Sequence, residues 1–491
     1  MTEALTDATE FMTDDDVDFE FSRSAVRARS SIFLDFDQSS AFMADEVILF
    51  SGGLDSLAGV VEKLATTDAR LALVTHRSAQ KRMPHQDWLA ARLKERFPGR
   101  ILWIPIKARR SAGEASETTQ RSRPLLFAAL GFLVSHILDT RQLLLFENGV
   151  VSQNLPISPQ VIGSLATRTT HPLVVHRLGH LLRLMTGEPF EFSNPYTWLT
   201  KTQVVSRLRD HGATDLIAES VSCSEVHNRT VVKTHCGACS QCIDRRFAMI
   251  ANGMGEYDPA SIYETEVLTD TREKSESRTM ALDWTRHAHS LANMDDLTFL
   301  ERFGSEIGRI IEGFPDQPSR QTALNIMELQ RRHGQAVQET LAWGVKNYSA
   351  ELIAGALPAT SLLRMFLSVM NGQATMPDTA TLKDRYAIQD QDLKQATSNK
   401  QNGIFPLRLT LSGEEKSCRL TVAGLGEVKG VNASVVVPMR PVHDEDVGGG
   451  RVAKEFRFTA SGAVAAALNP TSRLWSSAFC AAGANSKNST L

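Results

Sequence analysis

The stretch FSGGLDSLAGVVEKL, residues 50–64, decides how this chain is expected to fold. Residues 46–50 (EVILF) form a short apolar run that is typical of a buried strand. After it, apolar side chains recur at the spacing of one helix face, at Leu57, Val60, Val61 and Leu64. The residues between strand and helix must therefore form a tight turn. Two glycines let its backbone approach a ligand closely, and unpaired N–H groups at the helix start attract an anion. The stretch predicts a phosphate-binding turn.

The alternation of strand and helix continues through the first half of the chain. Apolar runs predict strands at residues 46–50, 70–77, 100–106 and 142–150, and two longer segments predict helices at 85–97 and 123–138. This rhythm is typical of βαβ units, so we expect an α/β fold with a parallel sheet and helices on both faces. Ligands of such a sheet bind beyond the carboxyl ends of the strands, which is where the turn lies.

The sequence divides into regions of different character. The leading segment is polar, a later region has apolar residues at helical spacing, and the last region alternates apolar and polar residues before an Ala/Ser/Asn-rich end. We therefore predict a polar leader (1–44), the α/β domain (45–255), a helical region (256–375) and a small β-rich module with a flexible tail (376–491).

Composition narrows the class of protein. The 491 residues are 42% hydrophobic and 22% charged, as in an ordinary globular chain, and the net charge of −3 does not indicate nucleic-acid binding. No apolar run is long enough to span a membrane. The segment MTDDDVDFEF (12–21) is acidic, the reverse of a signal peptide, so we expect a cytoplasmic protein.

Four of the six cysteines form a cluster in the sequence. Their spacing is C-x12-C-x2-C-x2-C, and thiolates at C-x2-C spacing are typical ligands of structural zinc. The predicted zinc ligands are Cys223, Cys236, Cys239 and Cys242. Two alternatives stay open: an iron–sulfur cluster held by the same thiolates, and a site in which His227 or His235 replaces one cysteine.

These motifs together resemble a known family. SGGLDS (51–56) resembles the SGGxDS signature of the PP-loop ATP pyrophosphatases, which have an adenine nucleotide alpha hydrolase-like fold. With the cysteine cluster that follows, residues 45–255 resemble the 7-cyano-7-deazaguanine synthase (QueC) family. Weaker similarities occur in the same order as in that family: QRSRPLLFAAL (120–130), NPYTWLTKTQVV (194–205) and CGACSQCIDRRFAM (236–249).

The resemblance implies an enzyme that uses ATP to adenylate the carboxylate of 7-carboxy-7-deazaguanine before an amine displaces AMP. It implies ATP, Mg²⁺ and Zn²⁺ as cofactors. The implied nucleotide contacts are Ser51, Gly52, Gly53, Leu54, Asp55, Ser56 and His76. The implied catalytic residues are Asp55, which positions Mg²⁺ or the turn, and Lys201 with Arg121 or Arg123, which offset phosphate charge. The implied deazaguanine contacts are Asn148, Gly149 and Arg168.

The chain also departs from the family. Residues 147–172 lack the family's Asp-Cys-Arg element, and about half of the chain is additional. Both departures resemble QueC-like proteins of antiphage systems such as type IV CBASS and Qat, in which a deazaguanine is thought to be attached to the N-terminal amine of a partner protein. The additional regions would then dock that partner or mediate homo-oligomers. Alternatives are a free nitrile synthase using ammonia, a PP-loop tRNA-modifying enzyme, and an ATP-sensing scaffold without activity.

Overall fold

The computed structural model of the protein describes the chain in separate ranges. They are residues 1–22, 42–108, 121–157, 168–225 and 229–370, with the backbone of further strands between residues 405 and 457. Contacts divide the chain into two compact units. The first unit comprises residues 1–158 and 163–370, and the second comprises residues 159–162 and 371–491.

A parallel sheet forms the centre of the first unit, with the strand order β3-β2-β1-β4-β5. The strands are β1 (Glu46–Leu49), β2 (Leu71–His76), β3 (Ile101–Ile106), β4 (Gln142–Leu144) and β5 (Glu191–Ser193). The parallel α/β sheet predicted from the sequence is therefore confirmed, and β5 is a strand that the sequence did not reveal. Strands β1 and β4 are neighbours, and the chain proceeds outward from them in opposite directions. Such a switch point opens a crevice at the carboxyl ends of the strands.

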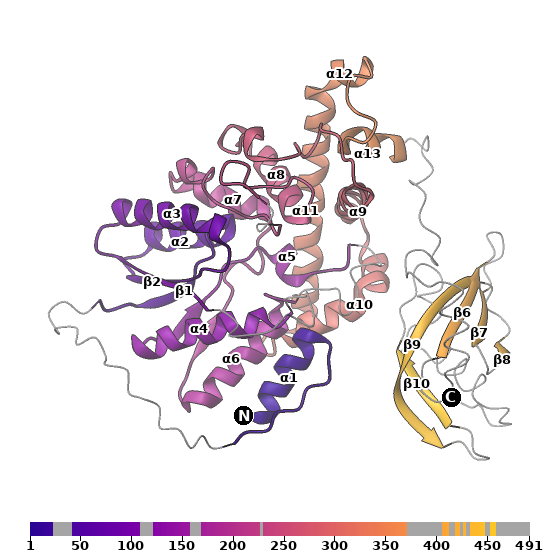
Figure 1. Ribbon diagram of the computed structural model, residues 1–491, viewed down its shortest axis with the longest axis horizontal. Coiled ribbons are helices and arrows are strands. Elements are labelled where there is room, and N and C mark those ends of the chain that lie inside the picture. Colours follow the sequence, from indigo (N-terminus) through magenta and orange to yellow (C-terminus); the bar gives the residue numbers. More distant parts are fainter. Residues whose placement is uncertain are drawn as a thin grey trace. The chain divides into compact units, whose positions relative to one another are not determined.

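Helices cover both faces of the sheet, as Figure 1 shows. One face carries α2 (Leu54–Thr66), α3 (Met83–Arg96), α7 (Lys201–Asp210) and α8 (Ser240–Ala251), and the other carries α4 (Arg123–Ile137) and α6 (Pro172–Thr186). Successive side chains of a strand point to opposite faces. Val47 therefore enters the core beneath α4 and α6, whereas Ile48 enters the core beneath α2 and α7.

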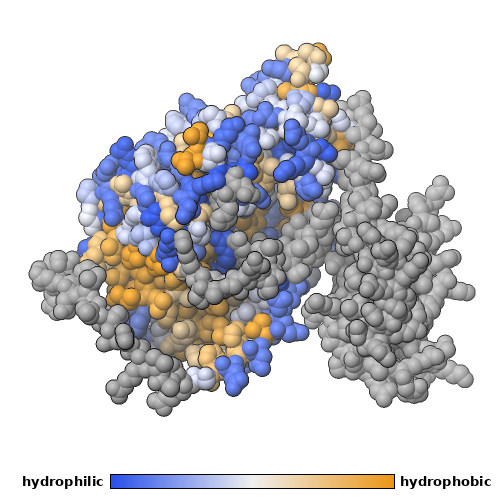
Figure 2. Space-filling view, in the orientation of Figure 1, coloured by the Kyte–Doolittle hydropathy of each residue, from blue (hydrophilic) through white to orange (hydrophobic). Residues whose placement is uncertain are grey.

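Two of these helices differ in how they use their apolar residues. The face of α2 predicted from the sequence is buried throughout. Helix α4 is apolar all round, so Leu126, Leu133 and Ile137 remain exposed on its outer side. Figure 2 shows apolar surface in the area of α4. Exposed apolar surface of this kind commonly marks a contact with another protein surface.

The helical region continues the same unit. It comprises α9 (Ser275–Leu291), α10 (Asp296–Glu312), α11 (Ser319–Asn347), α12 (Ser349–Ile353) and α13 (Leu362–Met370). The unit also contains short helices, which are α5 (Gly149–Gln153) and the 3-10 helices Gln80–Arg82, Thr214–Leu216, Gly255–Tyr257 and Ala260–Ile262. The ring of Trp284 packs edge-on against Phe247 of α8 at 5.1 Å. Thr340 Oγ1 of α11 donates a hydrogen bond of 3.2 Å to the Phe247 carbonyl. The boundary predicted after residue 255 therefore falls inside a shared core.

The leader predicted as polar contains a packed helix, α1 (Thr2–Thr13). Ala8 and Met12 are buried in the core that also contains α6. The remainder of the leader from 23 to 41 lies outside the described residues. The polar composition concealed α1 because only one narrow side of the helix is apolar.

The strands of the second unit form an antiparallel sheet in the order β10-β9-β6-β7-β8. They are β6 (Phe405–Leu411), β7 (Cys418–Val422), β8 (Gly426–Val428), β9 (Ala433–Asp446) and β10 (Val452–Arg457). They lie within the range 376–491 for which the sequence predicts a β-rich module. The module itself stays a prediction, and the predicted flexible tail lies outside the described residues. Within the described residues, no helix has the length and apolar character needed to cross a membrane.

Candidate functional site

The predicted phosphate turn joins β1 to α2. Gly52 has a φ of 78°, a conformation that side chains other than glycine rarely adopt. The Ser51 hydroxyl accepts a hydrogen bond of 3.2 Å from the Gly53 N–H and lies 3.1 Å from the Ser56 hydroxyl. Of the serines, Ser51 is exposed and Ser56 is buried. The turn therefore presents Ser51 outward, while Ser56 braces it from inside.

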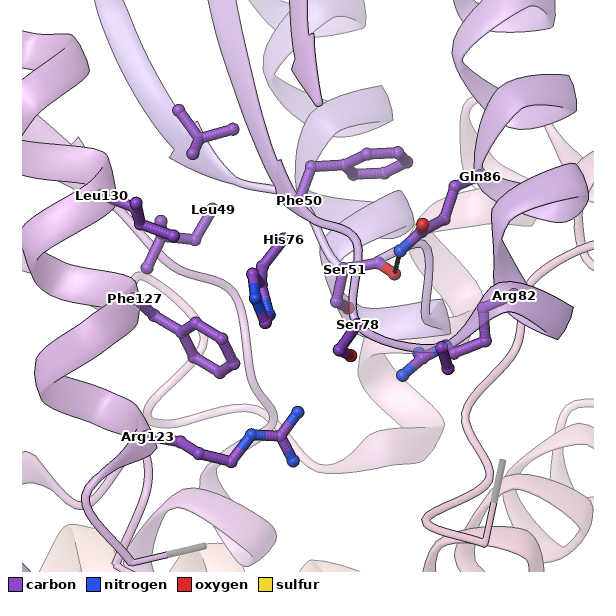
Figure 3. Close-up of a pocket in the computed structure, with 12 residues that line it drawn as sticks. Leu49, Phe50, Ser51, His76, Ser78, Arg82, Gln86, Arg123, Phe127 and Leu130 are labelled. Carbon is purple, nitrogen blue, oxygen red and sulfur yellow. Dashed lines mark hydrogen bonds between the residues drawn. The ribbon is translucent and has the colours of Figure 1, made fainter. Parts of the chain in front are cut away.

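A cavity of about 170 Å³ lies beside this turn (Figure 3). Its apolar wall comes from β1, β2 and α4, and His76 and Phe127 face one another there with ring centres 5.6 Å apart. The carboxyl ends of β1 and β2 contribute the polar groups of Ser51, His76 and Ser78. Gln86 of α3 donates a hydrogen bond of 2.9 Å to the Ser51 carbonyl and so fixes the start of the turn. The cavity combines an apolar wall, suited to a flat ring, with the predicted anion-binding turn.

Two arginines point into this cavity from opposite sides, Arg82 and Arg123 (Figure 3). Arg82 donates a hydrogen bond of 2.7 Å to the Val221 carbonyl, and within the described part of the chain its buried Nε has no hydrogen-bond partner. Burial, with the charge of Arg123 nearby, lowers the pKa of Arg82 to about 10, so the side chain remains charged at neutral pH. Two like charges facing one cavity favour a bound anion between them.

Behind the turn lies a cluster of buried polar groups. Lys201 Nζ, at the start of α7, donates a hydrogen bond of 2.6 Å to Asp55 Oδ2. Asn148 Nδ2 lies 3.4 Å from the same oxygen and 3.4 Å from Glu147 Oε1. The residues follow β1, β4 and β5, so the switch point of the sheet brings them together.

Burial and neighbouring charges shift the pKa values of Glu147, Asp244 and Lys201 in this cluster. Burial and the nearby Asp55 raise the pKa of Glu147 well above its usual range. Burial raises the pKa of Asp244 to about 7, against the opposing effect of Lys201. Burial alone would lower the pKa of Lys201, but Asp55, Asp244 and Glu147 raise it overall. Lys201 is thus a charged ammonium held among carboxyl groups.

The structure separates the predicted site residues into groups. Ser51, His76 and Arg123 line the cavity, and Gly52 and Gly53 form the turn beside it. Leu54 is fully buried in the core, and Lys201 is only 1% exposed and is not among the residues lining the cavity. In the structure Lys201 pairs with Asp55, and its expected contact with phosphate stays a prediction.

Arg121 and Arg168 contact the N-terminal segment instead of the cavity. Arg121 lies 3.4 Å from Asp15, and Arg168 lies 3.6 Å from Asp14. Arg168 also donates a hydrogen bond of 2.5 Å to the Phe11 carbonyl and lies over the Phe11 ring. Between the two arginines that the sequence left open, the structure brings Arg123 to the cavity.

The other predicted deazaguanine contacts have structural partners. Asn148 is fully buried, and its Oδ1 accepts a hydrogen bond from the Val151 N–H as the N-cap of α5. A Cβ at Gly149 would lie 2.0 Å from the Thr197 carbonyl oxygen, so the glycine allows a close backbone approach. In the structure, neither residue is among those lining the cavity.

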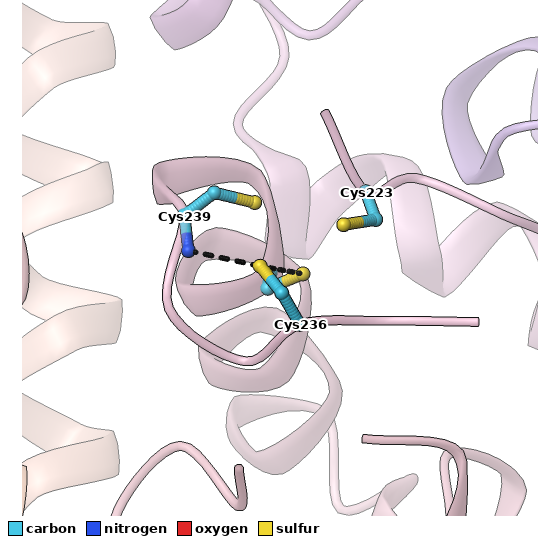
Figure 4. A group of neighbouring side chains, drawn as sticks. Cys223, Cys236 and Cys239 are labelled. Atoms are coloured by element: carbon cyan, nitrogen blue, oxygen red, sulfur yellow. Dashed lines mark hydrogen bonds between the residues drawn. The ribbon is translucent and has the colours of Figure 1, made fainter. Parts of the chain in front are cut away.

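The four predicted metal ligands converge, and Figure 4 labels three of them, Cys223, Cys236 and Cys239. The Sγ atoms of Cys223, Cys236, Cys239 and Cys242 all lie within 4.8 Å of one another. The backbone N–H groups of Ala238 and Cys239 each donate a hydrogen bond of 3.3 Å to Cys236 Sγ. Four thiolates bound tetrahedrally at about 2.3 Å to one ion lie roughly 3.8 Å apart. The Cys236 and Cys242 sulfurs are 3.8 Å apart, so the cluster fits a single zinc ion.

The two histidines considered as alternative ligands can be placed in part. His235 Nε2 accepts a hydrogen bond of 3.2 Å from the Ser222 N–H, and its Nδ1 lies 2.8 Å from the Thr234 hydroxyl. Both ring nitrogens are therefore engaged. His227 lies outside the described residues.

Five residues of the site are not among those predicted from the sequence: Arg82, Gln86 and Phe127 at the cavity, and Glu147 and Asp244 in the buried cluster. A usable signal existed for two of them: Arg82 and Gln86 follow the carboxyl end of β2, where ligands of parallel sheets bind. Asp244 lies on α8 among the cysteines, and nothing in its sequence context indicates a contact with Lys201.

Comparison with known proteins gives one family match. The family model described as QueC, queuosine biosynthesis protein QueC, matches residues 170–253. The matched range contains Lys201 and all four clustered cysteines but not the phosphate turn. No curated protein matches the chain. The match supports a PP-loop protein of the QueC kind, a family whose members use ATP.

Proposed function

We propose that the protein is an adenylating C–N ligase that acts on the carboxylate of a 7-carboxy-7-deazaguanine-type substrate. The acceptor is an amine, and we propose the N-terminal amine of a partner protein in an antiphage system. The observation that carries the proposal is the cavity between the phosphate turn, Arg82 and Arg123. The family match at residues 170–253 supports the choice of substrate class.

The chemistry begins with ATP, which we place with its base against the apolar wall and its phosphates at the turn. A carboxylate oxygen attacks the α-phosphorus, the bond from that phosphorus to the bridging oxygen breaks, and pyrophosphate leaves. Negative charge builds on the leaving group, and Arg82 and Arg123 stabilise it. The products of this step are an acyl-adenylate and pyrophosphate.

The amine then attacks the carbonyl carbon of the acyl-adenylate. The carbon–oxygen bond to AMP breaks, the nitrogen gives up a proton, and an amide forms. AMP and pyrophosphate are therefore the expected nucleotide products, in place of ADP and phosphate. A protein amine as acceptor changes only this second step.

Mg²⁺ would assist by binding the phosphates, since it typically takes one or two protein carboxylates and several phosphate oxygens. Asp55 is the residue that fits this role. One of its oxygens pairs with Lys201, and the other, Oδ1, has no hydrogen-bond partner among the residues that the structure describes.

The test incubates the full-length protein with ATP and 7-carboxy-7-deazaguanine. Parallel reactions contain ammonium, or the proteins encoded beside it, and mass spectrometry follows both small molecules and proteins. AMP formation with a mass increase on a protein N-terminus supports the proposal. A free nitrile formed from ammonium would identify the alternative synthase, and ADP with phosphate would contradict adenylation.

A further inference from the structure

Residues 220–223 connect the phosphate turn to the cysteine cluster. The Val221 N–H donates a hydrogen bond of 2.9 Å to the Gly52 carbonyl. The Ser222 hydroxyl accepts a hydrogen bond of 3.3 Å from the Leu54 N–H. The next residue, Cys223, is one of the four clustered cysteines. One short segment therefore contacts the turn at two points and enters the predicted metal site.

Helix α2 needs such a contact because it has no cap of its own. Its N-cap residue is Gly53, which has no side chain to accept a hydrogen bond from the first helical N–H groups. Ser222, 168 residues after Leu54 in the chain, supplies the hydroxyl that a local serine or aspartate would normally provide.

The segment is also held firmly from behind. Arg245 is fully buried and donates hydrogen bonds of 2.9 Å to the Ser220 carbonyl, the Ser220 hydroxyl and the Ile217 carbonyl. The Ser222 N–H donates to His235, and the Val221 carbonyl accepts from Arg82. The position of Ser222 is thus fixed by α8 and by the loop that leads to Cys236.

We propose that Ser222 is a positioning residue for the phosphate turn, and that metal binding at Cys223 holds it in place. This inference rests on the proposed function, because it assumes that the turn binds the phosphates of ATP. It assigns the cysteine cluster a second effect besides stability: the metal sets the geometry of the turn through one hydroxyl.

The first test measures binding of α,β-methylene-ATP to the zinc-loaded full-length protein. We expect Ser222→Ala to weaken binding about five- to tenfold, the effect of losing one helix cap. Ser222→Thr should restore most of the affinity, because threonine also caps helices. Ser206→Ala is the matched control: its hydroxyl donates a hydrogen bond of 2.8 Å to the Gln203 carbonyl within α7 and does not contact the segment 220–223. Equal affinity of Ser222→Ala and the wild type would overturn the proposal.

The second test follows hydrogen exchange of residues 51–57 by mass spectrometry. Exchange should accelerate in Ser222→Ala and after zinc chelation, and chelation should accelerate it less in Ser222→Ala than in the wild type. Additive effects of chelation and substitution would overturn the link to the metal. If the wild type binds no ATP analogue, the proposed function fails, and unchanged exchange in Ser222→Ala would separately refute the role of Ser222.

Discussion

Two edges of the candidate site are built in different ways: the turn edge, at the phosphate turn, and the N-terminal edge, at the contacts with the N-terminal segment. At the turn edge, Gly52, Ser222 and Cys223 are joined by buried contacts of the backbone and short side chains. At the N-terminal edge, Arg121 and Arg168 reach acidic residues that are about half exposed. Both edges contain residues that family resemblance assigns to the site. Ser51 at the turn edge lines the cavity, whereas neither Arg121 nor Arg168 is among the residues that line it.

The difference shows that an arginine in a sequence does not locate a binding site unless the partners of its guanidinium group are known. A glycine turn or a cysteine knuckle brings its own contacts, because its residues are neighbours in sequence. The side chain of an arginine is long, so it pairs with whichever carboxylate the fold places within its reach. Here those carboxylates are Asp14 and Asp15 of the N-terminal segment.

The largest expected effect concerns the cysteine cluster. Cys242→Ser removes a fully buried ligand, and we expect loss of the roughly one zinc ion per chain and a marked fall in melting temperature, since structural zinc contributes directly to folding free energy. Metal analysis and thermal unfolding test this, with Cys418→Ser as the control outside the cluster. Iron with labile sulfide in the anaerobically purified protein would contradict zinc.

The next effect concerns the buried pair behind the turn. Lys201→Met leaves Asp55 buried without its cation, and we expect a loss of about 3–5 kcal/mol in the free energy of unfolding. Lys63→Met is the matched control, because Lys63 pairs with Glu46 at 2.7 Å but is partly exposed, so its loss should be about 1 kcal/mol or less. Denaturant titration measures both. Adding Asp55→Asn to Lys201→Met should recover part of the loss, and no recovery would show that the pair is not the cause.

A pair of arginine variants tests the two edges directly. Arg82→Met should weaken binding of an ATP analogue about ten- to a hundredfold, since a charge-assisted hydrogen bond contributes about 1.5–3 kcal/mol. Arg168→Met should leave that affinity unchanged and lower stability, because it loses the contacts with Phe11 and Asp14. Calorimetric titration of both variants decides, and the reverse pattern would place the phosphates at the N-terminal edge.

The smallest effect is a pH dependence at the N-terminal edge. Burial, with Arg168 and other arginines nearby, lowers the pKa of His171 from 6.5 to about 3. The folded protein therefore binds fewer protons there than the unfolded chain, and stability falls as pH drops from about 6.5 toward 3. Between pH 7 and pH 5 this group alone should account for about 2 kcal/mol.

His171→Asn isolates this contribution. His171 is the N-cap of α6 and accepts a hydrogen bond from the Leu173 N–H, and asparagine can take over that role without titrating. Urea unfolding at pH 7 and pH 5 should show a smaller loss in the variant than in the wild type. Other buried histidines such as His287 remain in both proteins, so an equal loss in both would refute the assignment.

The sequence predicted what depends on local pattern. The turn, strands β1 to β4, helices α2 to α4 and the convergence of the four cysteines all follow from spacing and composition. Leu54 lies three residues before Leu57 on the buried face of α2, and its contact with the nucleotide stays a prediction. Strand β5 spans only Glu191–Ser193 and, unlike the equally short β4, is not part of a continuous apolar run.

The partners of charged residues could not be predicted. The pairing of Lys201 with Asp55 joins residues 146 positions apart, and the contact of Arg168 with Phe11 joins residues 157 positions apart. Such contacts depend on the tertiary arrangement of α1, α2 and α7, which no local pattern encodes.

The capping of α2 by Ser222 also sets an order of events during synthesis. A chain leaves the ribosome from its N-terminus, so the turn at residues 51–53 emerges long before the serine that completes it. Cys236, Cys239 and Cys242 follow later still, and α11, which packs on α8 through Thr340, follows after them. Contacts between distant segments form slowly, because a long loop must close first. The phosphate turn is therefore translated before the segments that hold it in place and matures after them.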